Sequence, residues 1–261
     1  MPGCAACGGQ RQSPIDINKN LGDKMTNENS LKIINGDLIP ESVTLSNDGH
    51  GVSYQLNFAN GEQVTLTGGP LGNATYVLHS FHTHWKSEHR VNGKRYDAEV
   101  HLVHYKSDYE SLSFAKTQPD GVAVLGFFFE IKSKYKLSNA IFNYLQNVLD
   151  HGTTETVNWA QSINDLITSK PFSIYSYPGS LTTPTCNEVV TWMVRIFIPK
   201  QRILCKLLFV TQMADRTLPM SLEEANNLRK IRLEDVTKIS RNNRPIQATN
   251  GRQIVKYRTE H

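Results

Sequence analysis

The segment Ser80-Phe-His-Thr-His-Trp85 alternates between histidines and other side chains, and this alternation predicts a β-strand. Residues two positions apart on a strand project from the same face, so His82 and His84 would point together. A second alternating segment, Glu99-Val-His-Leu-Val-His104, would place His101 on one face of a neighbouring strand. The sequence therefore predicts a sheet on which three imidazoles come within reach of one another.

Three neutral imidazoles with a fourth position left open are the ligands of many catalytic zinc sites. A ligating histidine usually needs a hydrogen-bond partner for its second ring nitrogen, and Glu88 and Glu99 are available for this. Spacing alone leaves two interpretations open, a metal site or histidines satisfied within the core or at the surface. It also does not separate a zinc hydratase from a zinc hydrolase, although no helical His-Glu-x-x-His motif occurs.

The sequence around these strands is also typical of β-structure. Gly121–Phe129 is short, β-rich and apolar on both faces, which predicts a central strand. The alternating runs 52–58 and 64–67 flank Asn60-Gly61, which predicts a hairpin, and Asn92-Gly93 predicts another.

Two helices are predicted between and after the strands. The first begins at an N-cap, Ser138, and ends before Gly152, with one apolar face. That face consists of Ile141, Phe142, Leu145, Val148 and Leu149. The second begins with the capping box Ser221-Leu-Glu-Glu224 and continues with a stripe of Leu222, Ala225 and Leu228. With no repeat or linker in view, residues 1–261 are expected to form a single β-dominated domain with peripheral helices.

Composition excludes several classes of protein. The chain has 261 residues, 39% of them hydrophobic and 20% charged, which is ordinary globular usage. Lys plus Arg (28) exceed Asp plus Glu (24) by only four, and no run of five like charges occurs, so no nucleic-acid partner is expected. No stretch approaches the roughly 20 apolar residues of a bilayer span. The first residues do not read as a signal peptide.

A set of ordered motifs resembles an alpha-class carbonic anhydrase and extends over nearly the whole chain. These motifs are Gln12-Ser-Pro-Ile-Asp-Ile17, Gly68-Gly-Pro70, Phe81-His-Thr-His-Trp85, Ser87-Glu-His89, Tyr96-Asp-Ala-Glu-Val-His-Leu-Val-His104, Tyr177-Pro-Gly-Ser-Leu-Thr-Thr-Pro184 and Arg244-Pro-Ile-Gln247. The resemblance implies a mainly β (α+β) single domain around a large twisted, mostly antiparallel central sheet with short peripheral helices.

The resemblance also implies an activity, the reversible hydration of carbon dioxide to bicarbonate and a proton. His82, His84 and His101 would be the ligands of Zn²⁺, which lowers the pKa of its bound water to about 7 and so provides a hydroxide nucleophile. Thr182 would accept a hydrogen bond from this hydroxide while donating one to Glu88.

The remaining site residues follow from the same resemblance. Glu99 would be the hydrogen-bond partner of His101, and His89 a member of the buried network rather than a ligand. Carbon dioxide, which gains from leaving water, would meet an apolar wall. That wall would consist of Val103, Val124, Leu181, Thr183 and Trp192. His50 would relay the proton, because a histidine near its ordinary pKa of about 6.5 suits that task. An exposed turn histidine without a role is the alternative for His50.

Cys7 and Cys186 match the disulfide of the secreted and membrane-anchored members of that family. A disulfide implies an oxidising compartment, and Asn73-Ala-Thr75 is a glycosylation sequon. We therefore expect an extracellular or cell-surface protein whose true N-terminus is not represented. Cys4 and Cys205 would stay unpaired.

Four departures from the family pattern stand out. The chain is short before Gln12, and the loop from Trp85 to Glu88 is about half a dozen residues shorter than usual, which affects the expected position of Glu88. Ser80 replaces a common glutamine, so one contact to the first ligand would be lost. Residues 195–213 read as an insertion at the end of a core strand, either a lineage-specific loop or a translated intron.

Two further functions compete with hydration. One is a carbonic-anhydrase-like binding protein that folds without turnover, although all three histidines, Thr182 and Glu88 are present. The other is a different zinc hydrolase, and weak esterase activity could accompany hydration. The expected partners are carbon dioxide and bicarbonate, with sulfonamides or anions as inhibitors. No direct membrane insertion is expected, and the chain is expected to be a monomer.

Overall fold

The computed structural model describes residues 5–18, 30–132, 140–167, 172–196, 217–234 and 241–260. Three residues of the sequence-based predictions, Cys4, Ser138 and Cys205, lie outside these ranges. Of the expected insertion, only Arg195 and Ile196 are described. None of the described helices has the length and apolar character needed to cross a membrane.

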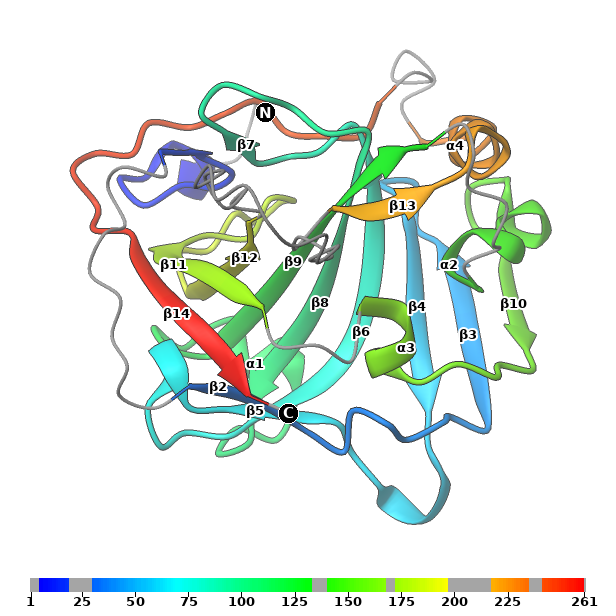
Figure 1. Cartoon of the computed structure of the whole chain (residues 1–261), viewed down its shortest axis with the longest axis horizontal. Helices are drawn as coiled ribbons and strands as arrows, with labels where there is room; N and C mark the ends of the chain where they lie inside the picture. The colour runs from blue at the N-terminus through cyan, green and yellow to red at the C-terminus, as the bar shows by residue number, and fades with distance from the viewer. Residues whose placement is uncertain are drawn as a thin grey trace, which may run out of the picture.

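A large twisted sheet runs through the molecule, and its long strands lie side by side in the middle (Figure 1). The central strands are β6 (Tyr76–Trp85), β8 (Ala98–Lys106), β9 (Val122–Ile131) and β12 (Val190–Arg195). β8 pairs with β6 on one side and with β9 on the other, antiparallel in both cases. The segment predicted as a central strand is therefore confirmed as β9.

The other strands extend this sheet on both sides. On one side are β4 (Val52–Asn57), β3 (Ser42–Asn47) and β10 (Thr154–Val157). On the other are β5 (Thr65–Thr67), β2 (Leu31–Ile34), β14 (Val255–Glu260), β11 (Ser173–Gly179) and β13 (Leu218–Met220). The pairings run from β6 through β5, β2, β14, β11, β12, β9 and β8 back to β6, so they form a closed ring. β1 (Asp16–Ile17) and β7 (Arg90–Val91) form a separate parallel pair.

Most pairings in the large sheet are antiparallel, and the parallel ones are β12 with β9, β13 with β9, and β14 with β2. Short helices lie at the periphery, as the resemblance implied. They are α1 (Leu112–Ala115), α2 (Ala140–Asn143), α3 (Ile163–Ile167), α4 (Leu222–Arg229) and the 3₁₀ turns η1 (Ala5–Gly8), η3 (Ala59–Gly61), η4 (Gly69–Leu71) and η5 (Leu145–Val148). The mainly β fold class is confirmed.

Both faces of the central sheet are covered by apolar side chains. Along β9, Leu125 and Phe127 belong to the larger apolar cluster, whereas Val124 and Phe128 belong to the smaller one. Because both faces are buried, this strand has no polar alternation, and its continuous apolar sequence follows from its central position. The smaller cluster is the one that adjoins the histidines, since it contains Trp192.

The hairpin predicted from Asn60-Gly61 is wrong. A turn does form there, at η3, but β4 and β5 do not pair with each other. Both strands instead pair with the same edge of β6, where Leu66 opposes Tyr76 and Tyr54 opposes Phe81. The long strand β6 thus takes the hydrogen bonds that a local hairpin would have used. The Asn92-Gly93 turn is confirmed, because both residues have positive φ and Val91 and Lys94 bridge across it.

The helix predicted after Ser138 is only partly present. The described residues form two short pieces, α2 and η5, separated at Tyr144, whose φ and ψ are −97° and 1°. The amide of Asn47 donates to the carbonyl oxygens of Val148 and Leu149, at 3.1 Å each, and so replaces the helical hydrogen bonds at that end. The apolar face is still buried, so packing was predicted better than local geometry.

The second predicted helix, α4, is confirmed together with its capping box. The Ser221 hydroxyl accepts from the Glu224 N–H, and the Glu224 carboxylate accepts from the Ser221 N–H. Ala225 and Leu228 are buried, but Leu222 is 57% exposed. Leu222 was therefore wrongly assigned to the buried stripe, because the first turn of the helix extends beyond the core.

Candidate metal centre and its surroundings

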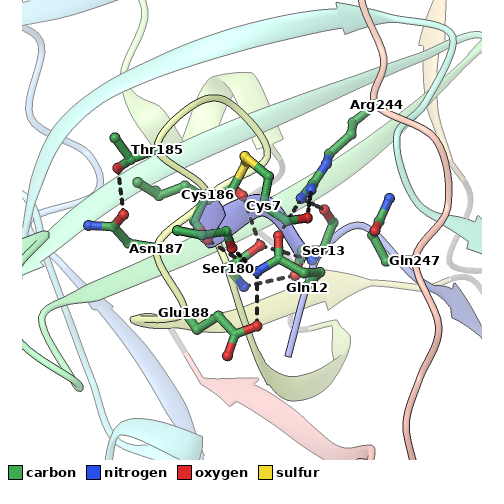
Figure 2. Close-up of a disulfide and its surroundings, with 12 residues drawn as sticks. Cys7, Gln12, Ser13, Ser180, Thr185, Cys186, Asn187, Glu188, Arg244 and Gln247 are labelled. Carbon is green, nitrogen blue, oxygen red and sulfur yellow. Dashed lines mark hydrogen bonds between the residues drawn. A yellow bond between two sulfur atoms is a disulfide. The ribbon is translucent and has the colours of Figure 1, made fainter. Parts of the chain in front are cut away.

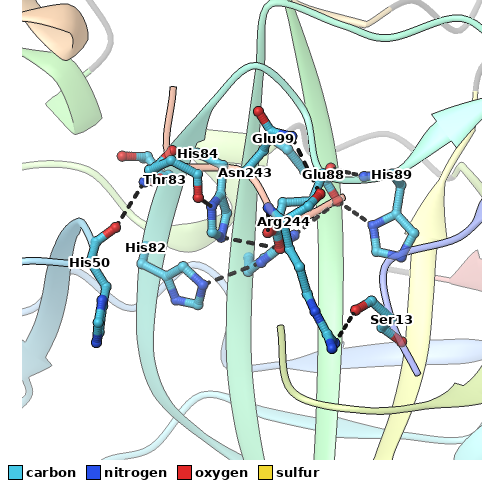
Figure 3. A network of polar contacts seen from close by, with 12 residues as sticks. Ser13, His50, His82, Thr83, His84, Glu88, His89, Glu99, Asn243 and Arg244 are labelled. Atoms are coloured by element: carbon cyan, nitrogen blue, oxygen red, sulfur yellow. Dashed lines mark hydrogen bonds and ion pairs between the residues drawn. The ribbon is translucent and has the colours of Figure 1, made fainter. Parts of the chain in front are cut away.

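Three histidines, His82, His84 and His101, meet on one face of the sheet. Figure 3 labels the two from β6, His82 and His84. His82 lies directly opposite His101 in the β6–β8 pairing, and His84 follows two residues later on the same face as His82. The Nε2 of His82 and the Nδ1 of His101 are 3.2 Å apart. Each of the three residues offers one ring nitrogen, and these atoms all lie within 4.8 Å of one another. The strand alternation therefore brings together the three histidines that the sequence singled out.

This cluster fits a tetrahedral zinc ion. Two ligand nitrogens at 2.0–2.1 Å from zinc in that geometry are about 3.3 Å apart, close to the separation of the His82 and His101 nitrogens. The Nε2 of His84 is buried and has no hydrogen-bond partner, which a coordinate bond would satisfy. Burial lowers the pKa of His84 to about 3, and burial and the neighbouring His101 hold the pKa of His82 well below its ordinary value. Both rings are thus neutral at pH 7, as metal ligands must be.

The carboxylate of Glu99 is completely buried and orients His101. Its Oε1 accepts from His101 Nε2 at 2.9 Å and from His89 Nδ1 at 2.7 Å, while its Oε2 accepts from the His89 N–H at 2.9 Å. Because His101 Nε2 carries the proton in this bond, its Nδ1 presents a lone pair toward His82. His89 continues the network through Nε2, which lies 2.6 Å from the hydroxyl of Tyr177.

Glu88 is also buried, despite the short loop before it. The chain turns at Lys86, with φ 66°, and the N–H groups of Lys86 and Ser87 donate across the turn to Asp97 and Tyr96. This turn leaves the Glu88 carboxylate buried.

The surroundings of the Glu88 carboxylate include the expected partner, Thr182. Its Oε1 accepts from the N–H of Arg244 at 2.7 Å, and its Oε2 lies 3.5 Å from His84 Nε2. Burial raises the pKa of Glu88, whereas the interactions with His101 and Thr182 lower it, with a net rise. Thr182 is buried as well, in the segment that follows β11.

An apolar row adjoins the histidines. Val103 opposes Val124 in the β8–β9 pairing, and Val124 opposes Trp192 in the β9–β12 pairing. All three are buried in the smaller apolar cluster, and Leu181 packs against it. The indole ring of Trp192 makes an edge contact with His101, at a centroid distance of 4.8 Å. Thr183, two residues after Leu181 in the chain, is half-buried.

His50 lies in an exposed turn between β3 and β4. It precedes Ser53 by three residues, and Ser53 is the register partner of His82. The peptide around it is fixed, since its N–H donates to Asp48 and its carbonyl oxygen accepts from Asn242.

Cys7 and Cys186 form a disulfide, as expected (Figure 2). The bond joins η1, at the start of the described chain, to the segment that carries Thr182. Gln12 reinforces the junction, because its amide donates to the carbonyl oxygens of Ala6 and Cys186 and to the carboxylate of Glu188.

Two residues around the centre were missed by sequence reasoning. Asn242 accepts from the Trp85 N–H and donates to the Thr83 and His50 carbonyl oxygens, so it fixes β6 beside the histidines. Arg244 contacts Glu88 through its backbone. Arg244 belonged to a motif of the resemblance without a role, and no local pattern marks either residue because both act across more than 150 positions of chain.

The sheet presents three imidazoles, with a carboxylate behind one of them and an apolar row beside them. These features place the chain in a class of β-sheet proteins with a candidate catalytic metal centre. A family model described as eukaryotic-type carbonic anhydrase matches residues 3–203. The chain belongs to this family.

Curated relatives agree with this assignment. The chain is 35% identical to human carbonic anhydrase 6 over 200 residues, covering 72% of this chain and 62% of that protein. It is 35% identical to human carbonic anhydrase 7 over 196 residues, covering 71% of each chain. Human carbonic anhydrase 12 is 32% identical over 244 residues, covering 88% of this chain and 66% of the relative. The chain thus spans a little over three fifths of the length of human carbonic anhydrase 6.

Proposed function

We propose that this protein is a zinc-dependent carbonic anhydrase that reversibly hydrates carbon dioxide to bicarbonate and a proton. The observation that carries the proposal is the three-histidine cluster, with His82 Nε2 and His101 Nδ1 3.2 Å apart and Glu99 behind His101. His82, His84 and His101 would hold the metal. Zn²⁺ in such a site lowers the pKa of a coordinated water to about 7 and supplies a hydroxide nucleophile at neutral pH.

The chain's own residues provide orientation and a dry surface. Glu88, which is buried like Thr182, would accept a hydrogen bond from the Thr182 hydroxyl, so the Thr182 oxygen would be left to accept a hydrogen bond from the nucleophile. The row of Val103, Val124 and Trp192, with Leu181 and Thr183 at its margin, would receive carbon dioxide because it excludes water. His50, exposed in the turn between β3 and β4, would carry the released proton to solvent.

The proposal is tested by stopped-flow carbon dioxide hydration on zinc-loaded protein with and without a sulfonamide. We expect sulfonamide-sensitive activity that is lost in His101→Ala, together with the bound zinc. His79→Ala is the matched control, since His79 lies on the same strand outside the cluster and should keep full activity. Absence of hydration from protein that binds one zinc per chain would favour the alternative, a carbonic-anhydrase-like binding protein.

An extracellular or cell-surface location is proposed on separate grounds. The Cys7–Cys186 disulfide is stable in an oxidising compartment and rare in the cytosol. The sequon asparagine, Asn73, lies exposed in the turn before β6, where an N-linked glycan would meet no packed side chain. Protein expressed through the secretory pathway should lose mass on treatment with a glycan-releasing amidase. A thiol count on unreduced, denatured protein that finds all four cysteines free would contradict the proposal.

A further inference from the structure

Arg244 connects two parts of the molecule that are far apart in sequence. Its guanidinium group donates to the Cys7 carbonyl oxygen at 3.0 Å, the Ser13 carbonyl oxygen at 2.7 Å and Gln12 Oε1 at 2.9 Å. Its backbone N–H donates to Glu88 Oε1 at 2.7 Å. One residue thus holds the N-terminal segment 7–13 with its side chain and a buried carboxylate of the centre with its main chain (Figures 2 and 3).

The Cys7–Cys186 disulfide belongs to the same circuit of contacts as Arg244 and Glu88. Cys186 is four residues after Thr182, and Cys7 supplies one of the carbonyl oxygens that hold Arg244. The path runs from Thr182 to Cys186, across the disulfide to Cys7, from its carbonyl oxygen to Arg244, and from the Arg244 N–H to Glu88. Thr182 and Glu88 are both buried, and the interaction with Thr182 lowers the pKa of Glu88, so the two ends of this path lie close to each other. The segment that carries Thr182 and the carboxylate of Glu88 are therefore both connected to a single covalent junction.

The buried guanidinium group of Arg244 depends on its hydrogen-bond acceptors. The Arg244 side chain is 6% exposed, and the oxygens that hold its guanidinium group are neutral. A buried cation is tolerated only when its donors are satisfied, and the planar fork of arginine matches oxygens at fixed angles, as the single point charge of lysine does not. If segment 7–13 shifts, the guanidinium group loses its acceptors, and the adjoining N–H loses its direction toward Glu88.

We propose that Arg244 is a positioning residue through which the Cys7–Cys186 disulfide sets the placement of the Glu88 carboxylate, and so of Thr182. The proposal rests on the proposed hydratase function for its kinetic consequence only. Its structural content, a coupling between the disulfide and the Arg244–Glu88 hydrogen bond, holds for the folded chain whatever its activity.

Arg252 offers a matched control. It also donates to segment 7–13, through a 2.8 Å bond to the Gln12 carbonyl oxygen, and to the Pro178 carbonyl oxygen at 3.1 Å. The described hydrogen bonds give it no contact with Glu88. Arg252→Lys thus perturbs the same segment without perturbing the same carboxylate.

The kinetic arm compares Arg244→Lys, Cys7→Ser/Cys186→Ser, their combination and Arg252→Lys, all with measured zinc content. Arg244→Lys and the disulfide variant should each lower kcat by about tenfold or more with KM unchanged, because small displacements of orienting groups are costly. The combined variant should lose less than about threefold further, since both changes break one circuit. The proposal would be overturned if the kcat loss in the combined variant equalled the product of the two separate losses. It would also be overturned if Arg252→Lys lost as much kcat as Arg244→Lys.

The structural arm uses hydrogen exchange on the full chain as purified and needs no turnover. Loss of the disulfide should lower the protection of the Arg244 amide by about tenfold or more while the amide of Phe127, in the centre of β9, keeps its protection. Unchanged protection at Arg244 would refute the coupling even if the enzyme is active. A protein that lacks activity but shows this selective loss would refute the hydratase function and retain the coupling. This arm also decides the question should Arg244→Lys fail to fold.

Discussion

Glu99 is a buried carboxylate surrounded by the donors it needs. Burial acts to raise its pKa, but the electrostatic interactions with His89 and His101 and the hydrogen bonds that they donate hold the pKa of Glu99 well below its ordinary value. Gly126, opposite His101 in β9, makes room for this arrangement, since a Cβ there would lie 3.2 Å from Glu99 Oε1. The carboxylate therefore stays ionised and keeps His101 in the tautomer that binds a metal through Nδ1.

Replacing this charge with an amide of the same shape should weaken zinc binding. We expect Glu99→Gln to lower zinc affinity by about 10–100-fold, the usual effect of losing a partner of a ligating histidine. Competition with a chromogenic chelator measures the affinity directly. Glu155→Gln, at an exposed position of β10, serves as the control and should leave affinity unchanged. An affinity within threefold of wild type in Glu99→Gln would show that the carboxylate does not orient His101.

His104, a buried histidine outside the three-histidine cluster, predicts a pH dependence of stability. His104 has its Nδ1 3.0 Å from the Leu102 carbonyl oxygen, and burial lowers its pKa to about 4. Its unfolded pKa is about 6.5, so between pH 6.5 and 4 the unfolded chain binds a proton that the folded chain does not. The free energy of unfolding therefore falls as the pH is lowered through this range.

The variant His104→Gln should lose this contribution. Between pH 7 and 4.5 its free energy of unfolding should fall by about 2 kcal/mol less than that of the wild type. Urea unfolding at both pH values in the presence of a chelator provides the comparison. His151→Gln, at an exposed position, should keep the wild-type difference. Equal pH dependence in all three proteins would show that His104 is protonated equally in both states.

At the scale of secondary structure, β12 and β13 share one edge of β9. β12 ends its pairing with Val194 opposite Gly126, and β13 resumes with Leu218 opposite Phe129. Only Phe127 and Phe128 of β9 lie between these two pairings, so the whole interval from β12 to β13 corresponds to two residues of β9. Arg195 and Ile196, the first residues of the expected insertion, are packed, since Arg195 donates to the Ile167 carbonyl oxygen and Ile196 is buried. The two strands are collinear along β9, as expected for one strand that carries an insertion.

A chain without residues 197–215 should fold and be more stable than the full chain. Shortening the connection between the strands reduces the entropy lost on closing it, by about 1–2 kcal/mol. For a protein of this size the midpoint of thermal unfolding should rise by several degrees. Thermal unfolding of the deletion variant and the full chain, with zinc content measured for both, tests this. A lower midpoint, or loss of zinc, would show that the segment is an integral part of the fold.

Sequence patterns predicted strands well where one chain segment carries the signal. Alternation identified His82 and His84, and the apolar run identified β9. The hairpin at Asn60-Gly61 failed because turn chemistry specifies a reversal but not which strand takes the hydrogen bonds. The predicted continuous helix is interrupted at Tyr144, and Asn47, far away in sequence, binds the carbonyl oxygens at the other end of the segment.

In the candidate site too, local sequence patterns do not predict the contacts between residues that are far apart in sequence. The resemblance to a family placed Glu88 and Thr182 in roles, but the turn that positions Glu88 in this chain depends on hydrogen bonds to Asp97 and Tyr96. Asn242 and Arg244 approach the centre only through the tertiary structure. Local pattern therefore predicts which side chains share a strand face, and it does not predict which distant residues complete their hydrogen bonds.

At the scale of the whole molecule, the disulfide closes most of the chain into a loop, because its two cysteines are separated by 179 positions in sequence. In the chain-entropy description, a loop of this length is worth about 5 kcal/mol to the folded state. Cys7→Ser/Cys186→Ser should therefore unfold at a markedly lower concentration of urea than the oxidised protein, and reduced wild type should behave like the variant. If oxidised and reduced wild type unfold at the same concentration, the bridge does not constrain the unfolded chain.

Among the strands that the structure describes, β10 stands at one end of the pairing order, and its first three residues, Thr154, Glu155 and Thr156, are exposed. An exposed strand edge is a template onto which the edge of another copy can add, which is how many β proteins begin to aggregate. A carboxylate in the middle of that strand repels an identical strand laid alongside it. The long-term solubility of this sheet therefore depends in part on one surface glutamate, remote from the histidines and irrelevant to their chemistry.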